Sequence, residues 1–487
     1  CEKTQIVSES LELLEWPTIC RHLSTFAITE QGRKRCESFD LPLDVSSSQE
    51  LLCKTLEIGL LDVALDGGIS FQGIHDLENI LLICSKGGVA IGEDLLKVAN
   101  TLRAARKLRK LIFDQLIRPR LSELLKDVAT LPDLQKLLEF GLDEGGRIAD
   151  RASPKLSELR RHRNSVRLQR KDILQDIIRK YGGLLQDNII SERYGRPVLA
   201  FKAGTYDQIK GMIHDSSASG NTIYVEPQVV IPIGNSLAKI DSEISDEERR
   251  LLANWSKEVG FNADVIAHLG EILLQIEFAL SRARYSKWLN GVPAILDEKE
   301  NTLFEIKDFR HPLLVWNDFH EKKNTVVPTS FDVPSDLKVV AITGPNTGGK
   351  TVALKSIGLA VLMAKAGILL PCTGSPRLPW CKNVLADIGD EQSLQQNLST
   401  FSGHILRISR ILDAIASSRG TTLVLLDEVG AGTDPSEGTA LAMALLKIMA
   451  DRARLTIATT HFGELKALKY SDSRFENASV SFDSETI

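Results

Sequence analysis

The chain has 487 residues, a length that predicts about three domains at roughly 150 residues each. Hydrophobic residues make up 43% and charged residues 25%, values near the globular average that exclude disordered, collagen-like and low-complexity proteins. The net charge of −5 argues against a globally basic nucleic-acid binder but allows a local basic surface.

Apolar stretches and cysteines predict a soluble, intracellular protein. The longest apolar stretch, 357–370, is too short to span a membrane and contains Lys365. Seven cysteines are scattered without a CxxC pair or zinc-ligand spacing, which favours reduced thiols. The chain begins at Cys1 rather than Met and ends without a helical cap, which is what a fragment would show.

Leucines at helical spacing extend from Ser8 to about Phe140 and predict an all-helical region, so residues 1–150 are assigned to a helical core. A glycine-rich stretch, 141–154, interrupts this region. Its final dipeptide, Ser-Pro, is typical of a new helix start.

Residues 151–300 are predicted to form a long two-helix arm. Apolar residues recur every seven positions over 159–173 and again over 252–280, where Asn262 is the polar exception. We expect these two segments to pack against each other; two ordinary core helices joined by a hairpin are the alternative.

Residues 188–232, between these helices, predict a small β clamp at the end of the arm. The runs RPVLAF, QIKGMIH and NTIYVEP have strand character, and DSSASG is typical of a turn.

Strands and helices alternate in residues 301–487, which predicts an α/β domain. The runs LKVVAIT, TTLVLL and LTIATT are short, rich in β-branched residues and without polar alternation, as buried parallel strands require.

The first of these strands leads into GPNTGGKT and an apolar helix, which matches the phosphate-binding pattern GxxxxGK[ST] in the context that it needs. Backbone N–H groups and the helix N-terminus would bind phosphate oxygens, Lys350 would reach the β- and γ-phosphates, and Thr351 would ligate Mg²⁺. The predicted nucleotide-binding residues are Gly344, Pro345, Asn346, Thr347, Gly348, Gly349, Lys350 and Thr351.

Two further strand ends carry candidate catalytic residues. Asp427 and Glu428 follow LVLL, where Asp427 would hold Mg²⁺ through water and Glu428 would orient or deprotonate the attacking water. His461 follows LTIATT and would lie near the γ-phosphate; a surface histidine is the alternative. Ser399 or Thr400 would cap a helix whose N–H groups bind an anion, with an ordinary N-cap as the alternative.

Four segments in this order, GPNTGGKT, DIGDEQSLQQNLSTFSGH, LLDEVGAGTDPSEGTALA and ATTHF, resemble the ATPase domain of the MutS family, an ABC-type ATPase. The DEQS run and the DPSEG run are similar to the second type of this family. GMIHDSSASGNTIYVEP resembles the clamp region of that type, and FRHPL resembles the segment that leads into its ATPase domain. The resemblance therefore covers nearly the whole chain.

The resemblance implies ATP and Mg²⁺ as cofactors and a homodimer in which Ser399 and Thr400 complete the site of the opposite subunit. Residues 430–434 would cross the same interface, and His461 matches the switch histidine. It further implies Lys350, Glu428 and His461 as catalytic residues, and an adenine contact from residues 309–311, with His311 as the candidate.

The chain also departs from the family. A mismatch-recognition domain and a connector domain have no room before the helical core, so direct mismatch reading is not expected. Nothing after His461 resembles the Smr nuclease domain of type-2 members, so nuclease activity is not supported.

Clustered positive charge on the first arm helix and in the β tip predicts contact with a nucleic-acid backbone, whereas a solvated helix face is the alternative. The candidates are Arg160, Arg161, Arg163, Arg167, Arg193, Arg196, Lys202 and Lys210.

The resemblance implies an ATP-driven homodimeric clamp on branched DNA that suppresses homologous recombination. A ribosome-associated ATPase, acting on stalled or collided ribosomes, is the alternative. An ABC transporter subunit would leave the arm unexplained, and an SMC-type ATPase would separate its motifs by a long coiled coil. The compartment would be cytoplasm or nucleoid in a bacterium and plastid in a plant.

Overall fold

The computed structural model describes residues 2–299, 303–321, 326–344, 349–389, 400–418 and 420–479. It divides the chain into two compact units that are each assembled from segments distant in sequence. The first unit comprises Cys1–Gln72, Lys107–Val128 and Gly270–Ile487, and the second comprises Gly73–Arg106 and Ala129–Leu269. These units group the residues differently from the three contiguous ranges expected from the sequence, and that three-domain division stays a prediction.

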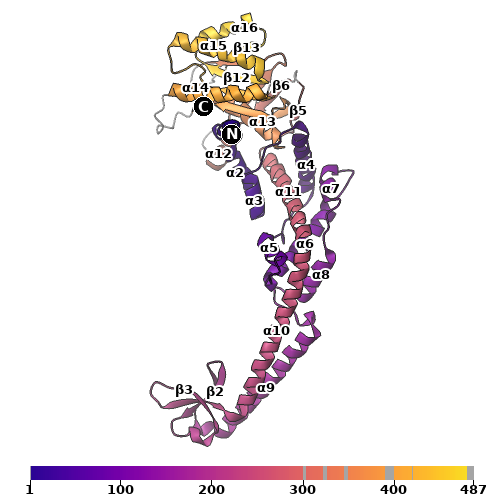
Figure 1. Ribbon diagram of the computed structural model, residues 1–487, viewed down its shortest axis with the longest axis vertical. Helices are drawn as coiled ribbons and strands as arrows, with labels where there is room; N and C mark the ends of the chain where they lie inside the picture. Colours follow the sequence, from indigo (N-terminus) through magenta and orange to yellow (C-terminus); the bar gives the residue numbers. More distant parts are fainter. Residues whose placement is uncertain are drawn as a thin grey trace. The chain divides into compact units, whose positions relative to one another are not determined.

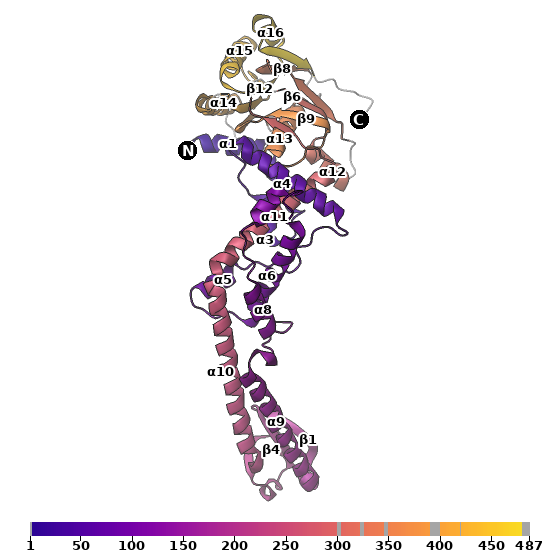
Figure 2. The same cartoon turned by 90° about the vertical axis from the view of Figure 1, so that its right-hand side faces the viewer.

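The second unit contains a pair of long helices, α9 (Pro154–Tyr181) and α10 (Ile231–Phe261), which lie side by side (Figures 1 and 2). The start of α9 agrees with the sequence: the Ser153 side chain accepts a hydrogen bond from the N–H of Leu156, and proline occupies the first helical position.

The residues of α10 that bond α9 precede the segment 252–280 that the sevenfold periodicity indicated as its partner. Arg160 pairs with Glu248 at 2.6 Å, and Arg163 pairs with Asp241 at 3.4 Å. The expected pairing is wrong because a seven-residue pattern reports which side of a helix is buried, without specifying what covers it.

The periodic segment also crosses a break between two helices. Asn262 ends α10 with its N–H directed at the C=O groups of Glu258 and Val259, and its side-chain amide donates to the C=O of Glu258. The following helix, α11 (Ala263–Trp288), carries the rest of the pattern. The polar exception in the repeat therefore marks the boundary between the two helices.

Between α9 and α10 the chain forms a four-stranded antiparallel sheet with the order β1-β2-β4-β3 (Figure 1). The strands are β1 (Leu185–Arg193), β2 (Arg196–Lys202), β3 (Gly211–Ser216) and β4 (Thr222–Pro227). The last three contain the strand-like runs of the sequence. Most of β1 is exposed, so it lacks the apolar pattern that would have identified it. Leu174 of α9 packs with Leu199 and Val225 beneath the sheet.

Glu247 of α10 bonds the residue that caps α9 and so links the two helices. Its side chain is only 2% exposed, and it accepts hydrogen bonds from Ser153 Oγ at 2.7 Å and from the Arg250 guanidinium at 2.6 and 3.0 Å. The bond from Arg250 is the main cause that lowers the pKa of Glu247 to about 2, and burial opposes it. The ionised carboxylate is therefore the form that the fold stabilises.

Glu247→Gln is expected to destabilise the helix pair by about 1–2 kcal/mol at neutral pH, because it removes a charge that Ser153 and Arg250 both bind. A carboxyl whose pKa is depressed on folding stabilises the fold above its unfolded pKa of 4.5 and loses that effect as the pH falls towards about 2. Unfolding curves recorded from pH 7 to pH 2 should therefore converge at the acid end. Glu258→Gln, an exposed position on the same helix, is the control; an equal loss there would contradict this role.

The first unit is built on a five-stranded parallel sheet with the order β10-β11-β12-β8-β13. Its strands are β8 (Val339–Thr343), β10 (Asn383–Asp387), β11 (Thr422–Leu426), β12 (Leu455–Thr460) and β13 (Phe475–Ser479). The three apolar runs of the sequence are β8, β11 and β12, which confirms the expected α/β character of this region. All residues of β11 and β12 are buried, as strands covered on both faces require.

Alternate residues of these strands enter cores on opposite faces of the sheet. Leu425 packs with Leu354 on one face, and Val424 packs with Leu446 on the other. The covering helices are α13 (Lys350–Lys365), α14 (Thr400–Ser417) and α15 (Pro435–Arg452). This arrangement places the N-terminus of α13 directly after β8, as a phosphate-binding loop needs.

The described residues up to 141 form helices, in agreement with the leucine spacing. These helices are α1 (Glu2–Leu13), α2 (Trp16–Ser24), α3 (Glu30–Glu37), α4 (Val45–Ala64), α5 (Glu78–Ser85), α6 (Gly92–Ile112), α7 (Pro119–Leu125) and α8 (Pro132–Gly141). A second sheet of the first unit has the order β5-β9-β6-β7. Its strands and the remaining helices are β5 (Ile295–Asp297), β6 (Phe304–Phe309), β7 (Thr329–Val333), β9 (Thr373–Pro379), α12 (Pro312–Glu321) and α16 (Leu468–Ser471).

None of the helices in the described ranges combines the length and the apolarity needed to cross a membrane. The cysteines within these ranges are free thiols: Cys20, Cys36, Cys53, Cys84, Cys372 and Cys381.

Candidate nucleotide-binding site

Polar residues lie where three strands of the parallel sheet end, and a glycine follows a fourth. Asp387 ends β10, Asp427 and Glu428 follow β11, His461 follows β12, and Gly344 follows β8. Because all these strands are parallel, their carboxyl ends meet at one edge of the sheet, where open α/β sheets bind ligands.

Lys350 begins α13 and points back towards the loop that precedes it. Its ammonium donates to the C=O of Gly344 at 2.9 Å, and only 3% of the residue is exposed. Burial lowers the pKa of Lys350, and the carboxylates of Glu428 and Asp427 oppose this effect. Gly349 precedes α13 with φ of 74°, a left-handed conformation that glycine adopts without strain.

Asp427 is held by two hydroxyl groups. Thr351 Oγ1 donates to Asp427 Oδ2 at 2.6 Å, and Thr459 Oγ1 donates to Asp427 Oδ1. The sequence reasoning had singled out the first hydroxyl and missed the second. The signal for Thr459 was present in the run LTIATT, where a polar residue follows a buried apolar stretch next to the strand end.

Glu428 has an unusual backbone conformation that Thr459 supports. Its φ is 48°, a left-handed value that costs a non-glycine residue of order 1–3 kcal/mol. The N–H of Glu428 donates to Thr459 Oγ1 at 2.8 Å. One threonine therefore bonds both the Asp427 carboxylate and the Glu428 backbone N–H.

The ring of His461 bridges Lys350 and the carboxylate of Glu428. His461 Nδ1 lies 3.4 Å from Lys350 Nζ, and His461 Nε2 lies 3.1 Å from Glu428 Oε1. An ammonium only donates hydrogen bonds and a carboxylate only accepts them, so Nδ1 accepts and the proton of the neutral ring is on Nε2. The three residues predicted as catalytic, Lys350, Glu428 and His461, thus lie together.

Asp387 joins the sheet edge to α14. Its carboxylate is 2% exposed and pairs with His404 Nδ1 at 2.9 Å and with the Arg407 guanidinium at 2.6 Å. The bond to Asp387 is the main cause that raises the pKa of His404. The C=O of Asp387 accepts the N–H of Asp427 at 2.8 Å. This connection between α14 and the Asp427 strand end was not expected from the sequence.

Two glycines allow the segment after Glu428 to lie against α15. A Cβ on Gly430 would be 2.5 Å from the C=O of Gly438, and a Cβ on Gly438 would be 2.4 Å from the C=O of Gly430. Asp434 caps α15 by accepting the N–H groups of Ser436 and Glu437. The proposed passage of residues 430–434 across a dimer interface stays a prediction.

Several predicted residues lie outside the described part of the chain. In the phosphate-binding loop these are Pro345, Asn346, Thr347 and Gly348. Ser399 is also outside the described residues; Thr400 begins α14, and its side chain is not described.

The candidates for an adenine contact have other roles in the structure. Phe309 is 1% exposed and packs in the core, and Arg310 donates to the C=O of Leu289 at 2.9 Å. His311 is 6% exposed, and burial lowers its pKa to about 4; its buried Nδ1 has no hydrogen-bond partner among the described residues. An adenine contact from this segment stays a prediction.

Most of the predicted DNA-contacting side chains are bonded within the second unit. Arg160 also bonds Asp150, and Arg167 lies 3.9 Å from Asp241. The tip residues have partners as well: Arg193 with Asp215, Arg196 with Glu226 and Asn235, and Lys202 with the C=O of Gly183. In contrast, Arg161 and Lys210 are exposed and have neither an ion pair nor a side-chain hydrogen bond within the described ranges.

Comparison with known proteins gives the family context of this site. Residues 340–486, which include β11, β12 and α13, match the family model of MutS domain V. The chain is 45% identical over 99% of its length to a protein named Endonuclease MutS2 from Synechocystis sp.. The resemblance read from the motifs is thereby confirmed: nearly the whole chain is similar to proteins of MutS2 type.

Two further MutS2 proteins show the extent of the likeness. Those of Symbiobacterium thermophilum and Pelotomaculum thermopropionicum are 40% and 38% identical, each over 98% of this chain. This chain spans 61%, 59% and 60% of the three relatives in turn. The relatives are named endonucleases, and the name describes those whole proteins.

Proposed function

We propose that this MutS2-type chain hydrolyses ATP and uses the energy to drive a homodimeric clamp on branched DNA. The observation that carries the proposal is the set of contacts by which His461 joins Lys350 and Glu428 beside the Thr351–Asp427 pair. A lysine for phosphate, a carboxylate for water and a hydroxyl–carboxylate pair for Mg²⁺ are the parts that phosphoryl transfer needs.

The residues present fit a magnesium ion. Thr351 Oγ1 and Asp427 Oδ2 lie 2.6 Å apart, and hydroxyl and carboxylate oxygens are the hard ligands that Mg²⁺ prefers. Thr351 would hold the ion directly and Asp427 through water. When bound, the ion neutralises charge on the phosphate oxygens.

The catalytic roles follow from the positions of the side chains. Lys350 would bind the β- and γ-phosphates, which would replace the C=O of Gly344 as its partner. Glu428 would orient the attacking water and accept its proton. The Nε2–H of His461 would hold the Glu428 carboxylate in position. The Nδ1 atom of the same ring contacts Lys350 and would connect that carboxylate to the bound phosphates.

We place Ser399 and Thr400 at the site of the opposite subunit in a homodimer. The ordered connection from α14 through Asp387 to Asp427 supports this role, because it couples the helix that follows these residues to the nucleotide site of its own subunit. On this proposal, each hydrolysis event changes the clamp between an open and a closed state, and the clamp suppresses homologous recombination.

We expect the DNA backbone to contact the exposed positive side chains of the second unit that have no partner among the described residues. The double variant Arg161→Ala/Lys210→Ala is expected to weaken DNA binding and to lower the salt slope of the binding constant by about 2, as two lost phosphate contacts would. Fluorescence anisotropy over a salt series measures both quantities. The matched variant Arg163→Ala, which breaks a pair with Asp241, should leave the salt slope unchanged. A lower slope for this variant, with an unchanged slope for the double variant, would return the DNA contact to the paired arginines.

The substrate is tested by binding the chain, with a non-hydrolysable ATP analogue, to four-way junction DNA, homoduplex DNA and purified ribosomes. Preference for the junction supports the clamp on branched DNA. Equal affinity for junction and homoduplex DNA would contradict a preference for branched DNA. Preference for ribosomes would replace the proposal by a ribosome-associated ATPase.

A further inference from the structure

The N-terminal helix α1, assigned to the helical core from the sequence, packs on the edge strand of the parallel sheet. Ser10 is fully buried there; its Oγ donates to the C=O of Ile6 at 2.7 Å and accepts the N–H of Ala386 in β10 at 3.0 Å. Ile6 shares a core cluster with Leu385. The helix therefore covers an edge that would otherwise leave a backbone group of β10 unpaired.

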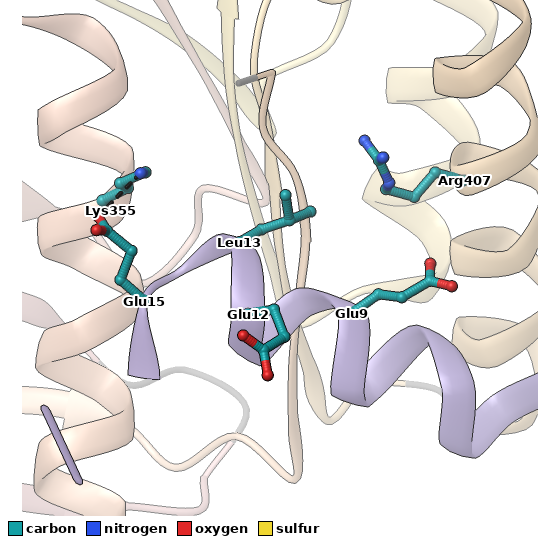
Figure 3. Close-up of a pocket in the computed structure, with 6 residues that line it drawn as sticks. All are labelled: Glu9, Glu12, Leu13, Glu15, Lys355 and Arg407. Carbon is teal, nitrogen blue, oxygen red and sulfur yellow. Dashed lines mark hydrogen bonds and ion pairs between the residues drawn. The ribbon is translucent and has the colours of Figure 1, made fainter. Parts of the chain in front are cut away.

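Two glutamates bond α1 and the residues just after it to two different helices of the proposed nucleotide site. Near its middle, Glu9 accepts from the Arg410 guanidinium of α14 at 2.9 and 3.2 Å. Two residues past its end, Glu15 pairs with Lys355 of α13 at 3.0 Å. Figure 3 shows α1 between these two helices.

The contacts of α1 border an open space between the helices. A cavity of about 410 Å³ is lined by Glu9, Glu12, Leu13, Glu15, Lys355 and Arg407, which are the residues drawn in Figure 3. At the borders of this space, the ion pairs of Glu9 and Glu15 link α1 to α14 and to α13.

The backbone at the end of α1 has a conformation that needs support. Glu15 has φ of 58°, the left-handed region that an L side chain rarely adopts, and it directly precedes α2. Nearby, Leu14 packs closely on α13: a Cβ added to Gly358 would lie 2.7 Å from a Leu14 methyl group. The sharp change of direction at Glu15 thus fits the approach of α1 to α13.

The two helices that α1 joins carry the proposed site. α13 starts with Lys350 and Thr351, and Lys355 is five residues further along the same helix. Arg410 lies three residues after Arg407, which bonds the Asp387 carboxylate. The C=O of Asp387 in turn accepts the N–H of Asp427. The spacing of α13 and α14 therefore affects where Thr351 stands relative to Asp427.

We propose that α1 is a brace of the nucleotide site and that Glu9 and Glu15 are positioning residues for ATP hydrolysis. The inference rests on the ATPase function proposed above. Both ion pairs are partly exposed, and pairs of this kind contribute little to the free energy of unfolding. Their effect is on geometry, because a small displacement of reacting groups costs far more in rate than in stability.

The test compares Glu9→Gln/Glu15→Gln with the unchanged 487-residue chain. The double variant should lower kcat for ATP hydrolysis about tenfold, while the Kd for a fluorescent ATP analogue and the thermal unfolding midpoint change little. Glu12→Gln is the matched control, since Glu12 lines the same cavity and has no side-chain partner among the described residues. It should keep the original kcat.

Exchange of the charges separates a positioning role from general damage. Glu9→Arg combined with Arg410→Glu should recover most of the kcat that Glu9→Gln loses. Arg410→Gln and Lys355→Gln break the same pairs from the other side and should reproduce the loss, which keeps the test decisive if the double variant folds poorly.

The outcomes distinguish this inference from the proposed function. If the unchanged chain does not hydrolyse ATP, the proposed function fails. If it hydrolyses ATP and the Glu9 and Glu15 variants behave like Glu12→Gln, or the double variant loses stability at an unchanged kcat, α1 is not a brace of the site.

Discussion

Glu428→Gln is expected to bind ATP with near-original affinity and to hydrolyse it about 10²–10⁴-fold more slowly, the range typical of a lost general base. An amide has the shape of the carboxylate and keeps the acceptor for the Nε2–H of His461, but it cannot take a proton from water. Single-turnover hydrolysis, with nucleotide binding measured separately, checks both parts.

The control for this variant is Glu464→Gln, an exposed position three residues after His461 without a bond to the site. It should hydrolyse ATP at the original rate. Ordinary turnover by Glu428→Gln would remove the residue from the catalytic role and leave it as a partner of His461.

Lys350→Ala is expected to abolish ATP binding, with Kd raised more than about 100-fold. The substitution removes the only ammonium described at this strand edge and with it the charge-assisted hydrogen bonds to phosphate, each worth about 1.5–3 kcal/mol. Isothermal titration with ATP and Mg²⁺ measures the effect.

Lys447→Ala, an exposed lysine on α15, is the matched control for total charge and should bind ATP as the original chain does. Retained binding by Lys350→Ala would mean that the loop between β8 and α13 does not hold the phosphates. That outcome would contradict the proposed site as a whole.

Much of the α/β region was predictable because its signals are local. Strands that are buried on both faces must be continuously apolar, so β8, β11 and β12 could be recognised one at a time. Polar residues directly after such strands must lie at the carboxyl edge of a parallel sheet. Asp427, Glu428 and His461 could therefore be assigned to one site before any contact was known.

Other features were missed because their signals are weak or ambiguous. β1 is largely exposed and shows no apolar pattern. The periodic segment 252–280 was expected to contact α9, but the bonding residues of α10 precede it, since periodicity identifies a buried face and carries no information on its partner. The pairing of several α9 arginines with acidic residues of α10 was also not expected, and nucleic-acid contact by these arginines stays a prediction.

Residue order thus determined the chemistry of the site, since a phosphate-binding loop, an Asp-Glu strand end and a strand-end histidine each depend on neighbours in the chain. Tertiary structure decided the contacts between segments that are far apart in sequence. It brought Thr459 to Asp427, Asp387 to His404 and Arg407, and α1 to a sheet edge more than 370 positions away, where Ser10 meets Ala386. Such contacts depend on which faces the packed core brings together, and no local pattern encodes that choice.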